Sequence, residues 1–178
     1  AGLQCNFHQI EIVRSISVWR DVCALVALYR FFHSAHFDIV HSISPKAGLL
    51  AMLAARIAKV PHRIHTFTGQ VWVTSCGLRR FLLKNLDRLL SKCTTNTLID
   101  SHSQKDFLVS EGVISSKKAK VLGRGSICGV DEKRFKPNPE MRKAMRAELG
   151  IPDSVPLLLF VGRLNRDKGV LDLAPPYH

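Results

Sequence analysis

The sequence has few features of a secreted or membrane-spanning protein. Its five cysteines stand far apart, form no C-x-x-C pair and are odd in number, so neither a disulfide framework nor a zinc knuckle is indicated. The longest uncharged apolar stretch of helical composition, residues 47–55, is about half the length of a membrane-spanning helix. The first residues do not resemble a signal peptide. We therefore expect a protein of the reducing cytoplasm.

Acidic residues are also scarce. The 178 residues include 26 Lys and Arg against 14 Asp and Glu, a net charge of +12 at pH 7. Residues 78–92 and 117–146 carry nearly all of this excess. Hydrophobic residues make up 46% of the chain and charged residues 22%, which is a globular composition and excludes a disordered or collagen-like protein. The charge predicts an anionic partner.

Short strand-like runs alternate with helical runs along the first 122 residues. The predicted strands are 8–13, 37–41, 63–67, 96–99 and 119–122. The predicted helices are 18–33, 46–59, 78–92 and 102–110. This alternation predicts an α/β fold with an open, mostly parallel sheet.

The pattern changes after residue 122. Glycines, a Pro-Asn-Pro turn and a charged helix at 140–149 indicate an interdomain connection. Residues 155–162 then have the pattern of a buried strand, and residues 168–173 that of a starting helix. Because the sequence begins without methionine and stops inside a helical pattern, we expect a fragment truncated at both ends. The expected parts are a first domain at 1–136, a linker and helix at 137–154, and the start of a second α/β domain at 155–178.

Residues 78–92 have the pattern of a cationic amphipathic helix, with basic residues every four positions opposite a broad apolar sector. We expect the apolar sector to pack on the sheet and the basic side to face anionic lipid headgroups. The residues expected to face the membrane are Arg79, Arg80, Lys84 and Arg88. A solvated helix face is the alternative. No helix-turn-helix, zinc finger or RNP-like motif accompanies the helix to indicate nucleic acid.

The most informative motif lies at residues 160–169. An apolar run leads into Gly162, where the backbone can approach a ligand closely, and Arg163 and Lys168 follow beside the start of the next helix. The planar fork of Arg163 can grip phosphate oxygens while Lys168 adds a point charge. The motif therefore predicts a diphosphate site, in which two cations neutralise a departing nucleotide diphosphate without a metal.

The pattern G-R-L-x-x-x-K-G at residues 162–169 resembles the donor-diphosphate motif of the retaining GT-B glycosyltransferases of family 4, the group 1 glycosyltransferases. Residues 125–137 resemble the segment that ends the acceptor domain of this family, and residues 37–48 resemble the middle of that domain. The resemblance extends over residues 9–173 and points to bacterial enzymes that build polysaccharide, such as capsule or lipopolysaccharide, on lipid carriers. It implies a partial acceptor-side Rossmann-like domain followed by the start of a nucleotide-sugar-binding domain.

The resemblance also implies a reaction. The full enzyme would move a sugar from a nucleotide-diphosphate sugar to a lipid-linked or polysaccharide acceptor with retention of configuration. It would need no metal or other cofactor and would lie peripherally on the inner face of the cytoplasmic membrane. Gly162, Arg163 and Lys168 would bind the donor diphosphate. The residues implied near the acceptor or in the cleft are His65, Thr68, Gly69, Ser126 and Asp131. No catalytic residue is assigned, and the fragment is expected to be inactive.

The chain departs from the family pattern at two positions. Thr68 stands before Gly69 where many relatives carry a histidine, so that histidine has no direct counterpart here and His65 is the nearest one. Cys128 occupies the usual asparagine position.

Other interpretations stay open at this stage. The main alternative is a non-enzymatic basic protein that binds anionic membrane or nucleic acid, and a further one is a nucleotide-sugar epimerase on the same fold. The histidine pairs 33/36 and 62/65 have no cysteine or carboxylate nearby at metal-ligand spacing. We expect neither a metal nor nucleic acid to bind.

Overall fold

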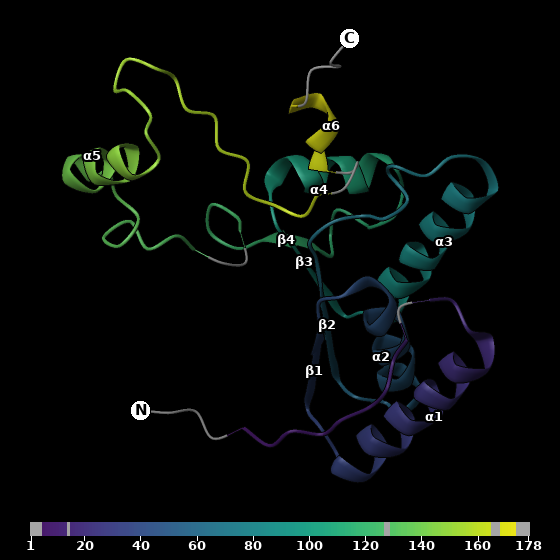
Figure 1. Cartoon of the computed structure of the whole chain (residues 1–178). Helices are drawn as coiled ribbons and strands as arrows, with labels where there is room; N and C mark the ends of the chain where they lie inside the picture. Colours follow the sequence, from purple (N-terminus) through teal and green to yellow (C-terminus); the bar gives the residue numbers. More distant parts are fainter. Residues whose placement is uncertain (1–4, 14, 127–128, 165–167, 174–178) are drawn as a thin grey trace. The chain divides into compact units, whose positions relative to one another are not determined.

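The computed structural model describes residues 5–13, 15–126, 129–164 and 168–173. The chain forms two compact units, Ala1–Ile127 and Cys128–His178 (Figure 1). The first holds the sheet and most of the candidate acceptor residues, and the second holds the candidate diphosphate residues. The finer division of the chain at residues 136 and 154 stays a prediction.

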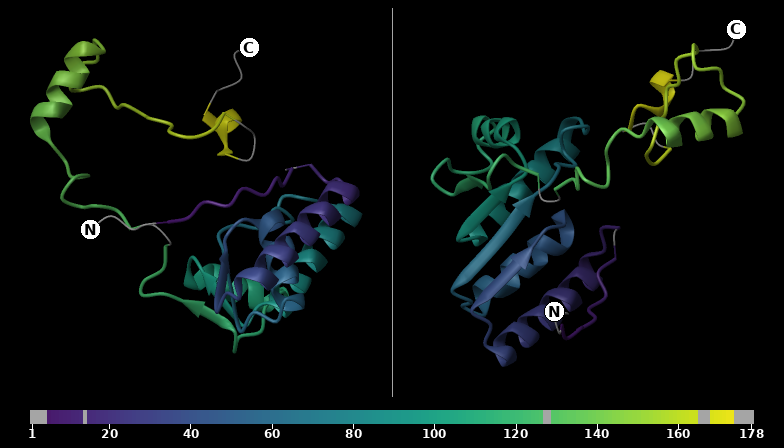
Figure 2. Two further views of the ribbon diagram at one scale, coloured as in Figure 1. Left: turned by 90° about the horizontal axis from the view of Figure 1, so that it is seen from below. Right: turned by 90° about the vertical axis from the view of Figure 1, so that its left-hand side faces the viewer.

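The first unit is an α/β layer structure whose strands are all parallel (Figures 1 and 2). The strand order is β1-β2-β3-β4, so each strand pairs with the next one along the chain. This confirms the predicted fold class. The elements are α1 (Val18–Ala35), β1 (Ile39–Ser42), α2 (Pro45–Ile57), β2 (His62–Phe67), α3 (Gly77–Cys93), β3 (Asn96–Ile99), α4 (His102–Ser110) and β4 (Ala119–Val121).

One face of the sheet carries the core. Strand side chains alternate between the two faces, and the residues on the helix side, such as Val40, Phe67 and Ile99, are buried. Figure 1 shows α1, α2 and α3 on this side of the strands. On the opposite face, Ile39 and His41 of β1 are exposed. The hydrophobic core therefore lies between the sheet and the helices rather than on both faces.

Helix α2 begins directly after β1, at the carboxyl end of the sheet. Ser44 takes the extended N-cap conformation and Pro45 is the first helical residue, where a missing N–H costs no hydrogen bond. The small side chains of the following turns allow close packing, and Met52, Ala54 and Ala55 are fully buried. The Ser44 N-cap and Pro45 thus fix where the helix starts.

The prediction of a strand at residues 8–13 is wrong. The segment is not hydrogen-bonded into the sheet. Its alternation of apolar and polar side chains still decides which of them are buried: Ile10 and Ile12 pack against the core, while Gln9 and Glu11 are exposed. The His8 ring stacks on Phe31 of α1, with ring centroids 4.1 Å apart. Period-two alternation predicts which side chains face the core, but a strand also needs a neighbour for its backbone groups.

Lys46 holds the end of this segment in place. Its ammonium group lies 2.7 Å from the carbonyl oxygen of Val13, 2.6 Å from that of Ser15 and 2.6 Å from Oδ1 of Asp21 in α1. One cation in the first turn of α2 therefore connects the N-terminal segment, α1 and α2.

We expect Lys46→Met to lower the free energy of unfolding by about 1 to 2 kcal/mol, because hydrogen bonds from a partly buried charged group are lost and Asp21 loses its partner. Urea titration followed by circular dichroism measures the change. Lys117→Met, at an exposed position, is the control and should change stability by about 0.5 kcal/mol or less. Equal stability of the two variants would contradict the role of Lys46.

The carbonyl end of α3 is surrounded by three basic side chains. Arg56 donates to the Lys92 oxygen at 3.1 Å and Arg63 donates to the Cys93 oxygen at 2.7 Å. Lys118 donates to the oxygens of Ser91 at 3.3 Å and Thr94 at 2.9 Å. Cations at a helix C-terminus stabilise it through these unpaired carbonyl groups and the helix dipole.

The second unit contains α5 (Pro139–Glu148) and α6 (Val170–Leu173). Asn138 caps α5 by accepting a hydrogen bond from the Met141 N–H at 3.0 Å. Arg146 is buried and donates to the oxygens of Pro152, at 2.7 Å, and Val155. The expected strand at 155–162 does not form, and its apolar side chains are largely exposed. The described part of this unit contains no strand that could pair with it.

Candidate functional site

The carboxyl ends of β1 and β2 carry two hydrogen-bonded pairs on opposite faces of the sheet. On the helix side, His65 Nδ1 lies 2.8 Å from Ser42 Oγ. On the other side, His41 Nε2 lies 2.7 Å from Thr66 Oγ1. In an α/β sheet this end of the strands is where ligands bind.

His65 is a buried and neutral histidine. The residue is 1% exposed, and burial is the main cause that lowers its pKa to about 4, with the charge of His41 as a second cause. The ring also makes an edge-to-face contact with Phe67, with centroids 4.6 Å apart. A Cβ atom added to Gly48 of α2 would lie 2.7 Å from His65 Cε1. The imidazole is thus packed directly on the backbone of α2.

The structure brings together three residues that the sequence placed near the acceptor. His65, Thr68 and Gly69 line one small pocket at the carboxyl end of β2. The remaining lining residues come from the β1–α2 connection, the start of α2, β2 and α3: Ile43, Pro45, Phe67 and Asp87. Ser126 does not line this pocket. It lines a separate pocket of about 160 Å³ together with His41, Thr66 and Asp100.

The chain turns tightly beside Ser126. Gly125 has a φ of +96°, and a Cβ atom there would lie 2.5 Å from the Asp100 oxygen. The Ser126 N–H donates to the same oxygen at 2.6 Å. Only glycine leaves room for the two loops to approach this closely. This explains why a glycine begins the segment 125–137 that resembles the family.

Trp72 anchors the loop between β2 and α3. The residue is 1% exposed, and its Nε1–H donates to Asp87 Oδ2 at 2.8 Å. Its ring stacks on Phe107 of α4, with centroids 5.5 Å apart, and the cationic groups of Arg80 and Lys84 lie 5.4 and 5.5 Å from the ring centroid. Thr68 and Gly69, at the start of the same loop, are thereby held near α3 and α4.

Asp87 is the only acidic residue of α3. Burial raises its pKa to about 6, and the hydrogen bond from Trp72 partly opposes this rise. Neither Trp72 nor Asp87 was predicted from the sequence as a residue of the site. The sequence did contain one signal for Asp87: it is a single carboxylate within a basic helix, and such a residue often has a specific partner.

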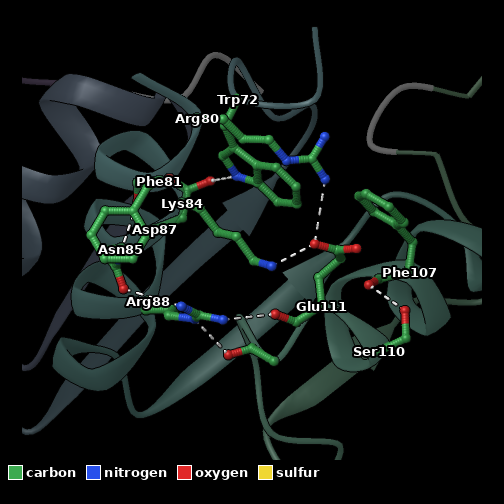
Figure 3. A network of polar contacts seen from close by, with 11 residues as sticks. Trp72, Arg80, Phe81, Lys84, Asn85, Asp87, Arg88, Phe107, Ser110 and Glu111 are labelled. Atoms are coloured by element: carbon green, nitrogen blue, oxygen red, sulfur yellow. Dashed lines mark hydrogen bonds and ion pairs between the residues drawn. The ribbon is translucent and has the colours of Figure 1, made fainter. Parts of the chain in front are cut away.

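The expected orientation of α3 is wrong. Lys84 Nζ lies 2.5 Å and Arg80 3.6 Å from Glu111 Oε2, and Arg88 donates to the backbone oxygens of Glu111 and Gly112 at 3.0 and 3.1 Å (Figure 3). The hydrogen bond from Lys84 is the main cause that lowers the pKa of Glu111. Three of the four residues expected to face lipid therefore bind the end of α4, because it offers a carboxylate and unpaired carbonyls. Arg79 is exposed.

The candidate diphosphate residues lie in the second unit. Gly162, Arg163 and Lys168 are all exposed, and Lys168 precedes α6. A Cβ atom on Gly162 would lie 3.2 Å from the Phe160 ring. Residues 165–167 of the motif, and Cys128, lie outside the described residues.

Asp131, another sequence-predicted cleft residue, also belongs to the second unit. Its Oδ1 accepts hydrogen bonds from the N–H groups of Lys133 and Arg134, at 3.0 and 3.2 Å, and so closes a turn. The structure therefore gives Asp131 a local role in the backbone of its own segment.

Two kinds of feature are absent from the described residues. No helix there is both long and apolar enough to cross a membrane. No group of three or more His, Cys, Asp or Glu in the same residues is arranged to hold a metal ion.

The parallel sheet and the polar residues at its carboxyl end define a Rossmann-like domain of the GT-B type. A family model described as the glycosyl transferase 4-like domain matches residues 1–125. The chain therefore belongs to the glycosyl transferase 4-like family, as the sequence motifs predicted.

Curated relatives are bacterial glycosyltransferases. The chain is 30% identical to the capsular polysaccharide biosynthesis glycosyltransferase CapM of Staphylococcus aureus, over 93% of this chain and 43% of the relative. It is also 30% identical to the UDP-Gal:alpha-D-GlcNAc-diphosphoundecaprenol alpha-1,3-galactosyltransferase of Escherichia coli, over 94% of this chain and 43% of the relative. An N,N'-diacetylbacillosaminyl-diphospho-undecaprenol alpha-1,3-N-acetylgalactosaminyltransferase of Campylobacter jejuni is 26% identical over 82% of the chain and 41% of the relative. The chain spans less than half the length of these relatives.

Proposed function

We propose that the chain is part of a retaining glycosyltransferase that moves a sugar from a nucleotide-diphosphate sugar to a lipid-linked or polysaccharide acceptor. The observation that carries this proposal is the Gly162-Arg163 to Lys168-Gly169 motif in a chain of the glycosyl transferase 4-like family. Two of the relatives have names that specify diphosphoundecaprenol-linked acceptors, which supports a lipid-linked acceptor here.

Arg163 and Lys168 bind the donor diphosphate in this proposal. Both are exposed in the second unit and available to an incoming anion. Charge builds up on the diphosphate as the glycosidic bond breaks, and two fixed cations stabilise it at that moment. The same cations remove the need for a metal or other cofactor. Gly162 allows the backbone to approach the phosphate.

The acceptor occupies the carboxyl end of the first unit's sheet in this proposal. His65, Thr68 and Gly69 line one pocket there, and Ser126 lines a second one with His41 and Thr66. A role of Asp131 in the cleft stays a prediction from the sequence. A low pKa keeps the His65 imidazole neutral near pH 7, so it serves as a hydrogen-bonding group and not as a cation. In this proposal the enzyme lies peripherally on the inner face of the cytoplasmic membrane, where a lipid-linked acceptor is accessible. It does not bind nucleic acid.

We expect Arg163→Ala and Lys168→Ala each to lower kcat/KM by about 10²-fold in a full-length protein that contains this sequence, the scale of losing one transition-state charge stabiliser. Radiolabelled nucleotide sugar and a diphosphate-linked lipid acceptor measure the rate. Arg142→Ala and Lys143→Ala remove exposed cations of α5 in the same unit and are the matched controls. Near-normal turnover of both motif variants would exclude the diphosphate role.

A further inference from the structure

The loop between β2 and α3 presents its first residues to solvent and buries one large side chain. Thr68 and Gly69 are exposed and line the pocket at the carboxyl end of β2. Val71 and Val73 are 51% and 44% exposed, whereas Trp72 between them is 1% exposed. The outer residues of the loop are therefore accessible to a ligand, while Trp72 attaches the loop to the rest of the domain.

Hydrogen bonds within the loop make it a compact turn. The Val73 N–H donates to the Gln70 oxygen at 3.3 Å. The Ser75 N–H donates to the Trp72 oxygen and its Oγ to the Val71 oxygen, both at 3.1 Å. Because the turn is closed internally, a shift of Trp72 displaces its neighbours as well.

The Trp72 ring lies between side chains of α3 and α4 (Figure 3). It stacks on Phe107 with an interplanar angle of 18°, and Arg80 and Lys84 lie over it. Such contacts depend only weakly on rotation of the ring within its own plane. The hydrogen bond from Nε1–H to Asp87 Oδ2, at 2.8 Å, does depend on it. Asp87 therefore fixes the orientation of the ring.

Asp87 also belongs to the pocket. It lines the pocket beside Thr68 while it accepts the hydrogen bond from Trp72. Helix α3 is itself tied to the end of α4 by the ion pair of Lys84 and the hydrogen bonds of Arg88. The Asp87 carboxylate thus has a fixed place, and one hydrogen bond sets how close the loop comes to α3.

We propose that Trp72 and Asp87 are positioning residues for the acceptor, and that their hydrogen bond places Thr68 and Gly69 where they contact it. The inference rests on the proposed function and deepens it, because it names the contact that organises the acceptor site before the acceptor binds. Without this hydrogen bond the Trp72 N–H is buried and unpaired, which favours a shift of the loop. A shift of about 1 Å in a binding group can lower kcat/KM by about 10²-fold.

Three substitutions separate positioning from a direct contact between the Asp87 charge and the acceptor. Asp87→Asn keeps an oxygen for the Trp72 N–H and removes the charge, whereas Asp87→Leu removes both. Trp72→Phe removes the N–H group and keeps an aromatic ring to stack on Phe107. Positioning predicts that only Asp87→Asn retains the function of the site.

Steady-state kinetics of the full-length protein test the proposal, with a diphosphate-linked lipid acceptor and the radiolabelled nucleotide sugar that the wild type transfers to it. We expect Asp87→Leu and Trp72→Phe to lower kcat/KM for the acceptor by about tenfold or more, and to change KM for the nucleotide sugar by less than about twofold. Asp87→Asn should stay within about threefold of the wild type. Lys118→Met, which removes a cation from the carbonyl end of α3, is the control for a loss of stability alone and should leave the kinetics unchanged.

Amide hydrogen exchange of residues 68–76 in the same proteins needs no substrate. Exchange should be about tenfold faster in Asp87→Leu and Trp72→Phe than in the wild type, and unchanged in Asp87→Asn and Lys118→Met. Circular dichroism checks folding. If Asp87→Leu does not fold, Trp72→Phe serves for both measurements.

Normal acceptor kinetics in Asp87→Leu and Trp72→Phe would overturn the proposal. Equal losses in Asp87→Asn and Asp87→Leu would overturn it too, because Asp87 would then act through its charge. Unchanged exchange of the loop in Trp72→Phe would contradict the attachment itself. A wild type that transfers sugar to no lipid-linked acceptor would overturn the proposed function and this inference with it, so the two failures are distinguishable.

Discussion

The Asp87→Asn variant is expected to gain about 3 kcal/mol of unfolding free energy between pH 4 and pH 7, while the wild type changes by about 1 kcal/mol or less. The profiles differ because two buried groups, His65 and Asp87, have opposite effects on how the free energy of unfolding changes with pH. The pKa of His65 is lowered to about 4, so the folded chain binds fewer protons than the unfolded chain until the pH passes 6.5, and stability rises with pH. The pKa of Asp87 is raised to about 6, so over nearly the same range the folded chain binds more protons and stability falls.

Urea titrations at several pH values, followed by the fluorescence of buried Trp72, measure these profiles. Asparagine keeps an oxygen that can accept the Trp72 hydrogen bond, so the variant removes the titration and retains the contact. His65→Gln is the converse variant and should lose about 2 kcal/mol of stability over the same pH range. A profile of Asp87→Asn parallel to that of the wild type would show that Asp87 does not titrate with a raised pKa.

Gly48→Ala is expected to lower the free energy of unfolding by about 2 to 3 kcal/mol, although alanine is the better helix former by about 1 kcal/mol. The added Cβ would lie 2.7 Å from Cε1 and 2.9 Å from Nδ1 of His65. The ring cannot move away freely, because Nδ1 is hydrogen-bonded to Ser42 and the ring edge contacts Phe67. Steric overlap with a confined ring therefore outweighs the gain in helix propensity.

The double variant Gly48→Ala/His65→Ala separates the clash from other effects of the helix substitution. If the clash dominates, the second substitution costs less in the Gly48→Ala background than in the wild type, because the ring that the Cβ meets is gone. Thermal unfolding of the four proteins gives this coupling energy. Additive effects, or a stable Gly48→Ala variant, would contradict the packing of His65 on α2.

Local patterns in the sequence predicted most of the first unit. The helix expected at 46–59 is α2 within two residues at each end, and the strands at the observed β1 to β4 were recognised from their strand-like runs. Such features depend on neighbours within a few residues, so the sequence contains them directly. The grouping of His65, Thr68 and Gly69 also followed, because they end one strand and begin the next loop.

The mistakes concern features that depend on distant partners. Residues 8–13 have strand alternation but no neighbouring strand, and the same holds for 155–162 among the described residues. In α3 the amphipathic pattern was recognised, but a helical wheel does not say which side faces the protein. Glu111 decides this, because it lies after α4 and attracts Arg80 and Lys84 inward.

The basic side chains at the end of α3 change how the net charge of the chain should be understood. Arg56, Arg63 and Lys118 are directed at backbone oxygens, so part of their field is already cancelled by the helix carbonyls. Arg63 and Lys118 are also half-buried, so they are less able than exposed cations to approach the phosphates of a polyanion and displace the counter-ions bound there. Part of the formal charge of +12 therefore stabilises the end of a helix inside this chain, and the net charge alone overstates the attraction for an anionic partner.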